Sequence, residues 1–231
     1  MTDIYYQPVL QTGSPRPAGA FAIGWCWFDR VIEHRRGADP VYVNAASIPA
    51  DVLQRLTVLR APIAGLSMDA PRIMGILNVT PDSFSDGGKF TNPDVAVGHA
   101  LAMAADGADI LDIGGESTRP GAATVEVDAE VARTAPVIAA IRAATHCPIS
   151  IDTRKARVAQ AAMDAGADLI NDVAAMTFDP AIAQVAASIG APVCLMHAKG
   201  DPATMQDDPA YDNVLLDVYD FLVARVEAAE A

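Results

Sequence analysis

The feature that most constrains this chain is an alternation of short apolar runs with alanine-rich amphipathic stretches, which begins near Ile73. Apolar runs bounded by polar or glycine-rich turns predict buried strands, and the stretches between them predict helices. Strands that alternate with helices in this way form βα units around a parallel sheet. The predicted strands are 73–77, 110–113, 149–151, 169–171 and 193–196, and the predicted helices are 94–106, 127–144, 155–165, 180–189 and 211–231.

A short repeat and the polar ends of the strands indicate how these units assemble. Gly107-Ala108-Asp109 precedes one predicted strand and recurs as Gly166-Ala167-Asp168 before another, and each glycine suits the end of a helix that leads into a barrel strand. In a (β/α)8 TIM barrel, active sites lie at the carboxyl ends of the strands. The polar residues at those ends are Asn78, 114–119, 152–154, Asn171, Asp172 and His197.

The number of units is smaller than a barrel requires. Only five βα units fit before Ala231, whereas closure takes eight strands. Five parallel strands alone would leave two unpaired edges and an uncovered barrel interior, which parallel sheets normally avoid. We therefore expect an α/β chain with about the first five βα units of a TIM barrel in residues 71–231, as a piece of a longer protein.

Residues 1–70 have a different pattern, and we expect them to form a small β-α appendage and a connector. Aromatic residues gather within 21–28, and His34, Arg35 and Arg36 form a basic cluster. A helix is predicted over 49–60, capped by Ser47. The segment shows no catalytic constellation.

Composition excludes several classes of partner. The hydrophobic content of 52% is ample for a buried core, and the net charge of -13 argues against binding to nucleic acid or to an anionic membrane surface. Cys26, Cys147 and Cys194 are too far apart to indicate a disulfide framework or a zinc site. No apolar run reaches the roughly 18 residues that a membrane span needs, so we expect a cytoplasmic protein.

Two loops carry the residues with the clearest chemical character. The loop 78–88 contains Asn78, carboxylates, a proline and paired glycines; it suits a mobile lid with hard oxygen ligands for Mg²⁺, although an ordinary turn has a similar composition. The loop 114–121 combines paired glycines with Ser117, Thr118 and Arg119, which predicts anion binding. The alternative for this loop is a simple pair between Glu116 and Arg119.

These two loops, in this order after the first two strands, resemble the two signature segments of the dihydropteroate synthase family. The resemblance continues through 150–153, 169–172 and 195–197, so it runs from about Arg72 to the last residue. It implies a pterin-binding TIM barrel whose substrates are a pterin diphosphate and 4-aminobenzoate. It also implies Mg²⁺ as cofactor and a homodimer for the complete family protein.

The resemblance implies that Asp152 and Asn171 bind the pterin, whose amino-pyrimidine edge carries adjacent donors and acceptors that a carboxylate and an amide can read. Val173 and Met196 would then be apolar walls for its two faces. Taken alone, Asp152 and Asn171 suit helix N-caps equally well. His197 lies at the rim of the fifth strand, and we interpret it as structural.

The same resemblance assigns roles to the two loops. Asn78 would serve Mg²⁺ and the diphosphate, and Asp86, Thr118 and Arg119 would close over the diphosphate and the aminobenzoate. Phe84 and Pro120 would flank the aminobenzoate ring. The family is thought to lose diphosphate first and to form a pterin cation that the arylamine captures, which needs leaving-group neutralisation and positioning more than a strong base.

The chain departs from the family pattern after the fifth strand, and two alternatives follow from this. The family continues with an Asp, a Lys and an Arg with a nearby His on later strands, and none of these follows here, so about half of the implied site is present. One alternative is a methyltetrahydrofolate methyltransferase, which resembles the family at the pterin-binding carboxylate and amide. The other is a noncatalytic pterin-binding protein.

Overall fold

The computed structural model describes residues 4–80, 93–117, 124–200 and 209–231. The chain forms two compact units, Met1–Pro71 and Arg72–Ala231. Within the described residues, no helix is long and apolar enough to cross a membrane.

The first unit is a small antiparallel sheet with a hairpin and a helix. Its three-stranded sheet has the order β1 (Tyr5–Pro8), β4 (Arg30–His34), β5 (Val41–Asn44), and β2 (Phe21–Ile23) pairs with β3 (Cys26–Phe28). A 3-10 turn, η1 (Ala45–Ser47), leads to α1 (Ala50–Thr57). A core of Phe28, Val31, Ala45 and Ile48 holds these elements together.

The predicted cap of the first helix was wrong. Helix α1 follows Pro49 and ends at Thr57, and no side chain caps its first turn. The Ser47 hydroxyl instead donates to the Asn44 backbone oxygen, 2.7 Å away, while the Asn44 side chain caps η1. The Ser47 side chain is therefore bonded within the short turn η1 and does not cap α1.

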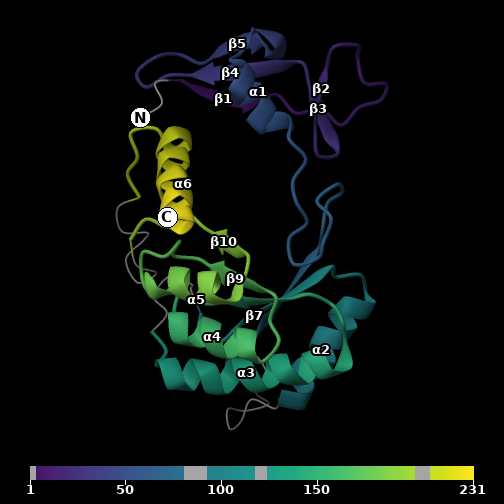
Figure 1. The fold of residues 1–231 in the computed structure, drawn as a ribbon, viewed down its shortest axis with the longest axis vertical. Coiled ribbons are helices and arrows are strands. Elements are labelled where there is room, and N and C mark those ends of the chain that lie inside the picture. Colours follow the sequence, from purple (N-terminus) through teal and green to yellow (C-terminus); the bar gives the residue numbers. More distant parts are fainter. Residues whose placement is uncertain (1–3, 81–92, 118–123, 201–208) are drawn as a thin grey trace. The chain divides into compact units, whose positions relative to one another are not determined.

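The second unit is a five-stranded parallel sheet with helices between its strands, as the alternation predicted. Its order is β6-β7-β8-β9-β10, with each strand beside its neighbour in the sequence (Figure 1). The strands are β6 (Met74–Asn78), β7 (Ile110–Gly114), β8 (Ile149–Asp152), β9 (Leu169–Asp172) and β10 (Val193–Leu195). The helices are α2 (Pro93–Ala105), α3 (Val127–Ala144), α4 (Ala156–Asp164), α5 (Ala181–Ile189) and α6 (Val214–Glu230). This is the arrangement of five consecutive units of a TIM barrel.

The two faces of this sheet differ in chemistry because successive side chains of a strand point to opposite sides. One face is apolar and packs against α2, α3, α4 and α5 in a single core (Figure 1). The strand residues of that core are Leu77, Leu111, Ile113, Ile149, Ile151 and Ile170. The alternate positions include the polar residues Asn78, Asp112, Ser150, Asp152 and Asn171, which lie toward the carboxyl ends of the strands. Apolar residues, namely Met74, Ile76, Ile110 and Leu169, occupy the amino ends of the same face.

The repeated Gly-Ala-Asp segment ends a helix and bonds to a neighbouring strand. Gly107 and Gly166 both adopt φ +109°, a left-handed conformation that ends the preceding helix turn without strain. The aspartate of each segment then accepts the backbone N–H at the start of the preceding strand: Asp109 from Ile73 at 2.7 Å, and Asp168 from Ile149 at 2.8 Å. The aspartates of the repeat therefore connect neighbouring strands at their amino ends, opposite the carboxyl ends that carry the polar rim residues.

Candidate functional site

One row of residues crosses the sheet at the carboxyl ends of its strands. Asn78 pairs with Gly114, Gly114 with Asp152, Asp152 with Asn171, and Asn171 with Cys194. Because residues in register on parallel strands point to the same side, these side chains share the face away from the helical core. The predicted rim residues Asn78, Asp152 and Asn171 are thus brought together.

Asp152 is an unsatisfied acid within this row. Its Oδ1 atom is buried and has no hydrogen-bond partner in the described part of the chain. Burial, and then the negative charges of Asp112, Glu130, Asp172 and Glu116, raise the pKa of Asp152 to about 7. Buried carboxylate oxygens are normally hydrogen-bonded, so a polar ligand with an N–H group would complete this site.

Asn171 contacts a second acid that the sequence did not single out. Its Nδ2 atom donates to the Oδ2 and Oδ1 atoms of Asp112, at 3.3 and 3.4 Å. Asp112 is 4% exposed, and burial raises its pKa although the side chains of Ser150 and Asn171 act in the opposite direction. One signal was present: Asp112 is a carboxylate two residues before Gly114, and so on the same face as the row.

Gly114, at the centre of the row, lets side chains of the two neighbouring strands approach its backbone closely. A Cβ atom there would lie 3.3 Å from the Asn78 Oδ1 and 3.5 Å from the Asp152 Oδ2. The missing side chain therefore lets an amide oxygen and a carboxylate oxygen approach from the two neighbouring strands. A ligand above Gly114 would meet oxygen atoms on both sides.

Neither Asp152 nor Asn171 caps a helix, which removes the alternative open at the sequence level. The N-cap residue of α4 is Lys155, and the first N–H of that helix, from Ala156, is accepted by Asp179 at 2.8 Å. After β9, Asp172 accepts the N–H groups of Ala174 and Met176 at 2.8 and 2.6 Å. The two row residues are thus left for other contacts.

The remaining residues near the rim have mixed environments. Val173 is half-buried and Met196 is 46% exposed, as apolar walls of an open site would be. Cys194 is exposed in the row. His197 packs against the rings of Phe221 and Tyr211, with centroid distances of 4.8 and 5.8 Å, which agrees with the structural interpretation.

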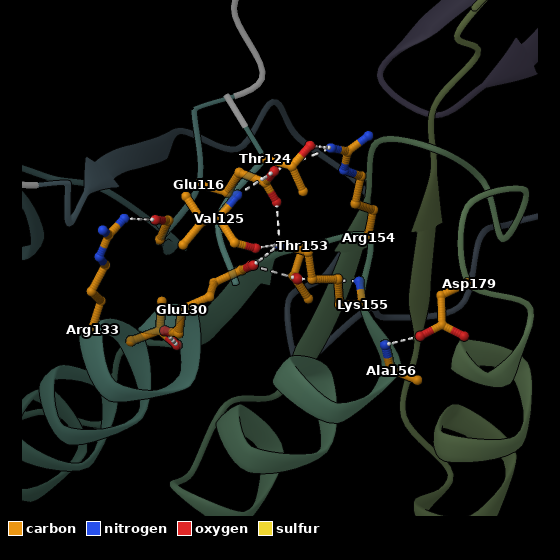
Figure 2. Close-up of polar contacts among 12 residues, drawn as sticks. Glu116, Thr124, Val125, Glu130, Arg133, Thr153, Arg154, Lys155, Ala156 and Asp179 are labelled. Carbon is orange, nitrogen blue, oxygen red and sulfur yellow. Dashed lines mark hydrogen bonds and ion pairs between the residues drawn. The ribbon is translucent and has the colours of Figure 1, made fainter. Parts of the chain in front are cut away.

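A buried ion-pair cluster lies beside the row and joins the ends of β7 and β8 (Figure 2). Lys155 Nζ contacts Glu116 Oε2 at 2.5 Å and Glu130 Oε2 at 2.6 Å, and it donates to the Val125 backbone oxygen at 2.6 Å. Arg154 contacts Glu116 Oε1 at 3.1 Å. The charged side chains of this cluster are at most 6% exposed, so it is part of the interior.

The cluster also holds the residues that follow Asp152 and those that precede α3. The Thr153 hydroxyl donates to Glu130 Oε1 at 2.7 Å, and the Val125 N–H donates to Glu116 Oε1 at 3.2 Å (Figure 2). Burial raises the pKa of Glu116, but hydrogen bonds and charges from Lys155 and Arg154 outweigh it and the pKa is lowered. Glu116 is therefore an ionised side chain that binds two cations of the next βα unit and the backbone N–H of Val125.

Several predicted site residues lie outside the residues that the structure describes: Phe84, Asp86, Thr118, Arg119 and Pro120. The alternative of a pair between Glu116 and Arg119 is untested, because Arg119 lies outside the described residues. For a metal ion, the described residues contain no group of three or more His, Cys, Asp or Glu side chains. Asn78 is exposed at the rim and offers its Oδ1, a hard oxygen of the kind Mg²⁺ accepts together with waters and substrate phosphates.

Comparison with known proteins gives a consistent set of relatives. Residues 74–231 match the protein family described as pterin binding enzyme. A dihydropteroate synthase of Synechocystis sp. is 50% identical over 157 residues, which are 68% of this chain and 54% of that protein. This chain therefore spans a little over half the length of the curated relative.

Solved structures agree in fold as well as in sequence. The Xanthomonas albilineans dihydropteroate synthase with 4-aminobenzoic acid is 51% identical, with a TM-score of 0.66 over 72% of this chain and 59% of that one. The same enzyme in complex with 7,8-dihydropteroate is 47% identical, with a TM-score of 0.62 over 71% of this chain and 57% of that one.

Proposed function

This chain belongs to the family of pterin-binding enzymes, and from that premise we propose that it has the activity of a dihydropteroate synthase. The reaction condenses (7,8-dihydropterin-6-yl)methyl diphosphate with 4-aminobenzoate to give 7,8-dihydropteroate and diphosphate. Relatives of 46 to 50% identity that carry this name favour it over a methyltetrahydrofolate methyltransferase.

The observation that carries the proposal is the buried Asp152 Oδ1, which has no hydrogen-bond partner in the described residues, on the strand next to that of Asn171. A pterin presents N–H donors along its amino-pyrimidine edge, and one flat ring reaches both residues. Hydrogen bonds between N–H groups and a carboxylate are among the stronger ones in proteins, so Asp152 would fix the ring. Val173 and Met196 would cover its faces.

Asn78 and the two loops would bind the diphosphate and the aminobenzoate, next to the carbon at which the reaction takes place. The arylamine nitrogen forms a bond to the pterin methylene carbon, the bond from that carbon to the diphosphate oxygen breaks, and the electron pair leaves with diphosphate. The amine proton goes to solvent. Asp86, Thr118 and Arg119 would bind the diphosphate and the aminobenzoate, and Phe84 and Pro120 would flank the aminobenzoate ring.

A bound Mg²⁺ would neutralise charge on the diphosphate, with Asn78 as its ligand from this chain. The chemistry of Asn78 supports this assignment, because its side chain is exposed at the rim and carries a hard amide oxygen. Mg²⁺ usually keeps several waters and takes one or two protein oxygens with substrate phosphates, so a single described ligand is sufficient.

We also propose that the complete protein is a cytoplasmic homodimer. The net charge of -13 argues against nonspecific binding to nucleic acid or to anionic lipid and is in keeping with small-molecule substrates. Light scattering on the purified protein checks the dimer, and cell fractionation checks the location.

Substitution of Asp152 tests the proposed activity. In Asp152→Asn, the amide presents a neutral oxygen or a donor where the pterin needs a carboxylate, so pterin affinity should fall about ten- to hundredfold. Fluorescence titration with a pterin and a turnover assay with both substrates measure the change. Asp164→Asn is the matched control, because Asp164 accepts only an exposed hydrogen bond from Gln160 among the described contacts.

The outcomes separate the candidate functions. Turnover that Asp152→Asn lowers and Asp164→Asn leaves intact supports a synthase. Pterin binding without turnover supports the noncatalytic alternative. Equal pterin affinity in the wild type and in Asp152→Asn would refute the assignment of the site.

A further inference from the structure

The amide of Asn171 has two chemically different ends, and its neighbours decide which end faces a ligand. An amide nitrogen only donates hydrogen bonds and an amide oxygen only accepts them. In the row, Asn171 stands next to Asp152, so its orientation determines whether the two residues together present two acceptors or one acceptor and one donor.

Asp112 lies where it can fix that orientation. It is on β7, two residues before Gly114 of the row and so on the same face, in register with Ser150 of β8. Its carboxylate is 4% exposed, and both of its oxygens lie within 3.4 Å of the Asn171 nitrogen. A carboxylate accepts hydrogen bonds from an amide nitrogen and would repel the amide oxygen, so the nitrogen end must face Asp112.

We infer that Asp112 is a positioning residue that sets the ligand specificity of the site: it holds the Asn171 nitrogen and so turns the Asn171 oxygen toward the ligand beside Asp152. This inference rests on the proposed function only for the identity of the ligand. The consequence is a pair of adjacent acceptors, Asn171 Oδ1 and Asp152 Oδ1. Such a pair selects a heterocycle edge with two N–H donors and rejects one with a carbonyl oxygen at the same place.

A pterin and its 2-oxo analogue, lumazine, differ in this respect. The pterin carries an amino group at carbon 2, whereas lumazine carries an oxygen there. An oxygen opposite the Asn171 oxygen leaves both without a donor and repels, while the amino group satisfies it. The ratio of the two dissociation constants therefore reports the orientation of Asn171, independently of overall affinity.

The first test removes the acceptor. In Asp112→Val, a side chain of similar size without polar atoms frees Asn171 to turn, so the preference for pterin over lumazine should fall about ten- to hundredfold. Ser150→Ala is the matched control, because Ser150 lies beside Asp112 on the same face, while the described side-chain hydrogen bonds of Asn171 go to Asp112. Its preference should stay within about threefold of the wild type, since the Asn171 amide keeps its partner.

The second test exchanges the two groups and guards against a folding defect in the first variant. Asn171→Asp alone places a second carboxylate against the buried Asp112 and should bind pterin poorly. Adding Asp112→Asn restores an amide that donates to a carboxylate, and the second carboxylate oxygen at position 171 again accepts from the ligand. The exchanged pair should therefore bind pterin at least about tenfold more tightly than Asn171→Asp alone.

An unchanged preference in Asp112→Val, or an equal fall in Ser150→Ala, overturns the inference. A failure of the exchanged pair to improve on Asn171→Asp also overturns it. If the wild type binds neither compound, the proposed function fails. The role of Asp112 is then tested without a ligand, by the hydrogen exchange of the Asn171 side-chain amide in NMR spectra. Slow hydrogen exchange of that amide in the wild type, made faster in Asp112→Val and unchanged in Ser150→Ala, supports the inference; fast exchange in the wild type overturns it.

Discussion

Lys155 offers a direct measure of how the buried ion-pair cluster stabilises the second unit. In Lys155→Met the apolar stem is kept and the charge is lost, while Glu116 keeps Arg154 as a partner at 3.1 Å. Glu130, whose side chain is 0% exposed, keeps only the Thr153 hydroxyl among its described partners. Removing one partner of a buried ion pair destabilises a protein by about 3 to 5 kcal/mol. For a protein of this size this corresponds to a fall in melting temperature of about 6 to 20 °C.

Urea denaturation followed by circular dichroism measures this free energy of unfolding. Arg157→Met is the matched control, because Arg157 pairs with Asp128 at 2.8 Å but their side chains are 72% and 78% exposed. Exposed pairs contribute about 1 kcal/mol or less, so this variant should change little. The double variant Glu130→Gln/Lys155→Met removes both charges and should recover part of the lost stability. Equal effects of Lys155→Met and Arg157→Met, or no recovery in the double variant, would refute the argument that an unpaired buried Glu130 causes the loss.

Three further predictions concern Asp152 and the two glycines at the end of β7. The pKa of Asp152 is raised from 3.8 to about 7, so between these values the folded state binds more protons than the unfolded state, and stability falls as pH rises through that window. A pH series of unfolding free energies should show this slope, at most about 1.4 kcal/mol per pH unit, reduced in Asp152→Asn; an identical slope in both proteins contradicts it. Gly115→Ala should destabilise by about 1 to 3 kcal/mol, because a Cβ would lie 2.7 Å from the Thr134 Cγ2 and 3.0 Å from the Glu130 Cγ. Gly114→Ala should instead weaken pterin binding, because its Cβ would contact Asn78 and Asp152, and calorimetry with thermal melts tells the two glycines apart.

The parts of this fold that the sequence predicted are those governed by local patterns. The five strands of the second unit were found because each is a short apolar run between polar turns, and the glycines at 107 and 166 marked the helix ends. The rim residues Asn78, Asp152 and Asn171 followed from strand order, since the carboxyl ends of parallel strands meet at one edge. Ser47 was misassigned because a local competitor, Asn44, binds the turn before the helix.

The parts that were missed depend on contacts between distant segments. Arg154 and Lys155 meet Glu116 across 38 and 39 residues of sequence, and no local pattern identifies that pairing. Asp112 stands in an apolar strand, Ile110–Gly114, every residue of which is buried, so composition suggested a core strand. Its chemical importance comes from Asn171, 59 residues later, which only the packing of the sheet reveals.

The two groups of buried acids differ in how their charge is compensated, and this difference supports the proposed pterin site. Glu116 and Glu130 lie against Arg154 and Lys155, and the pKa of Glu116 is lowered despite its burial. On the polar face of the sheet, burial raises the pKa of both Asp112 and Asp152, and Asp152 keeps an oxygen without a partner in the described residues. A buried acid that the fold leaves unsatisfied destabilises the free protein, and a ligand that donates to it removes that penalty. A ligand that binds only the folded state stabilises it. Pterin binding should therefore remove the cost of the unsatisfied Asp152 oxygen and leave the contacts of the cluster around Lys155 unchanged.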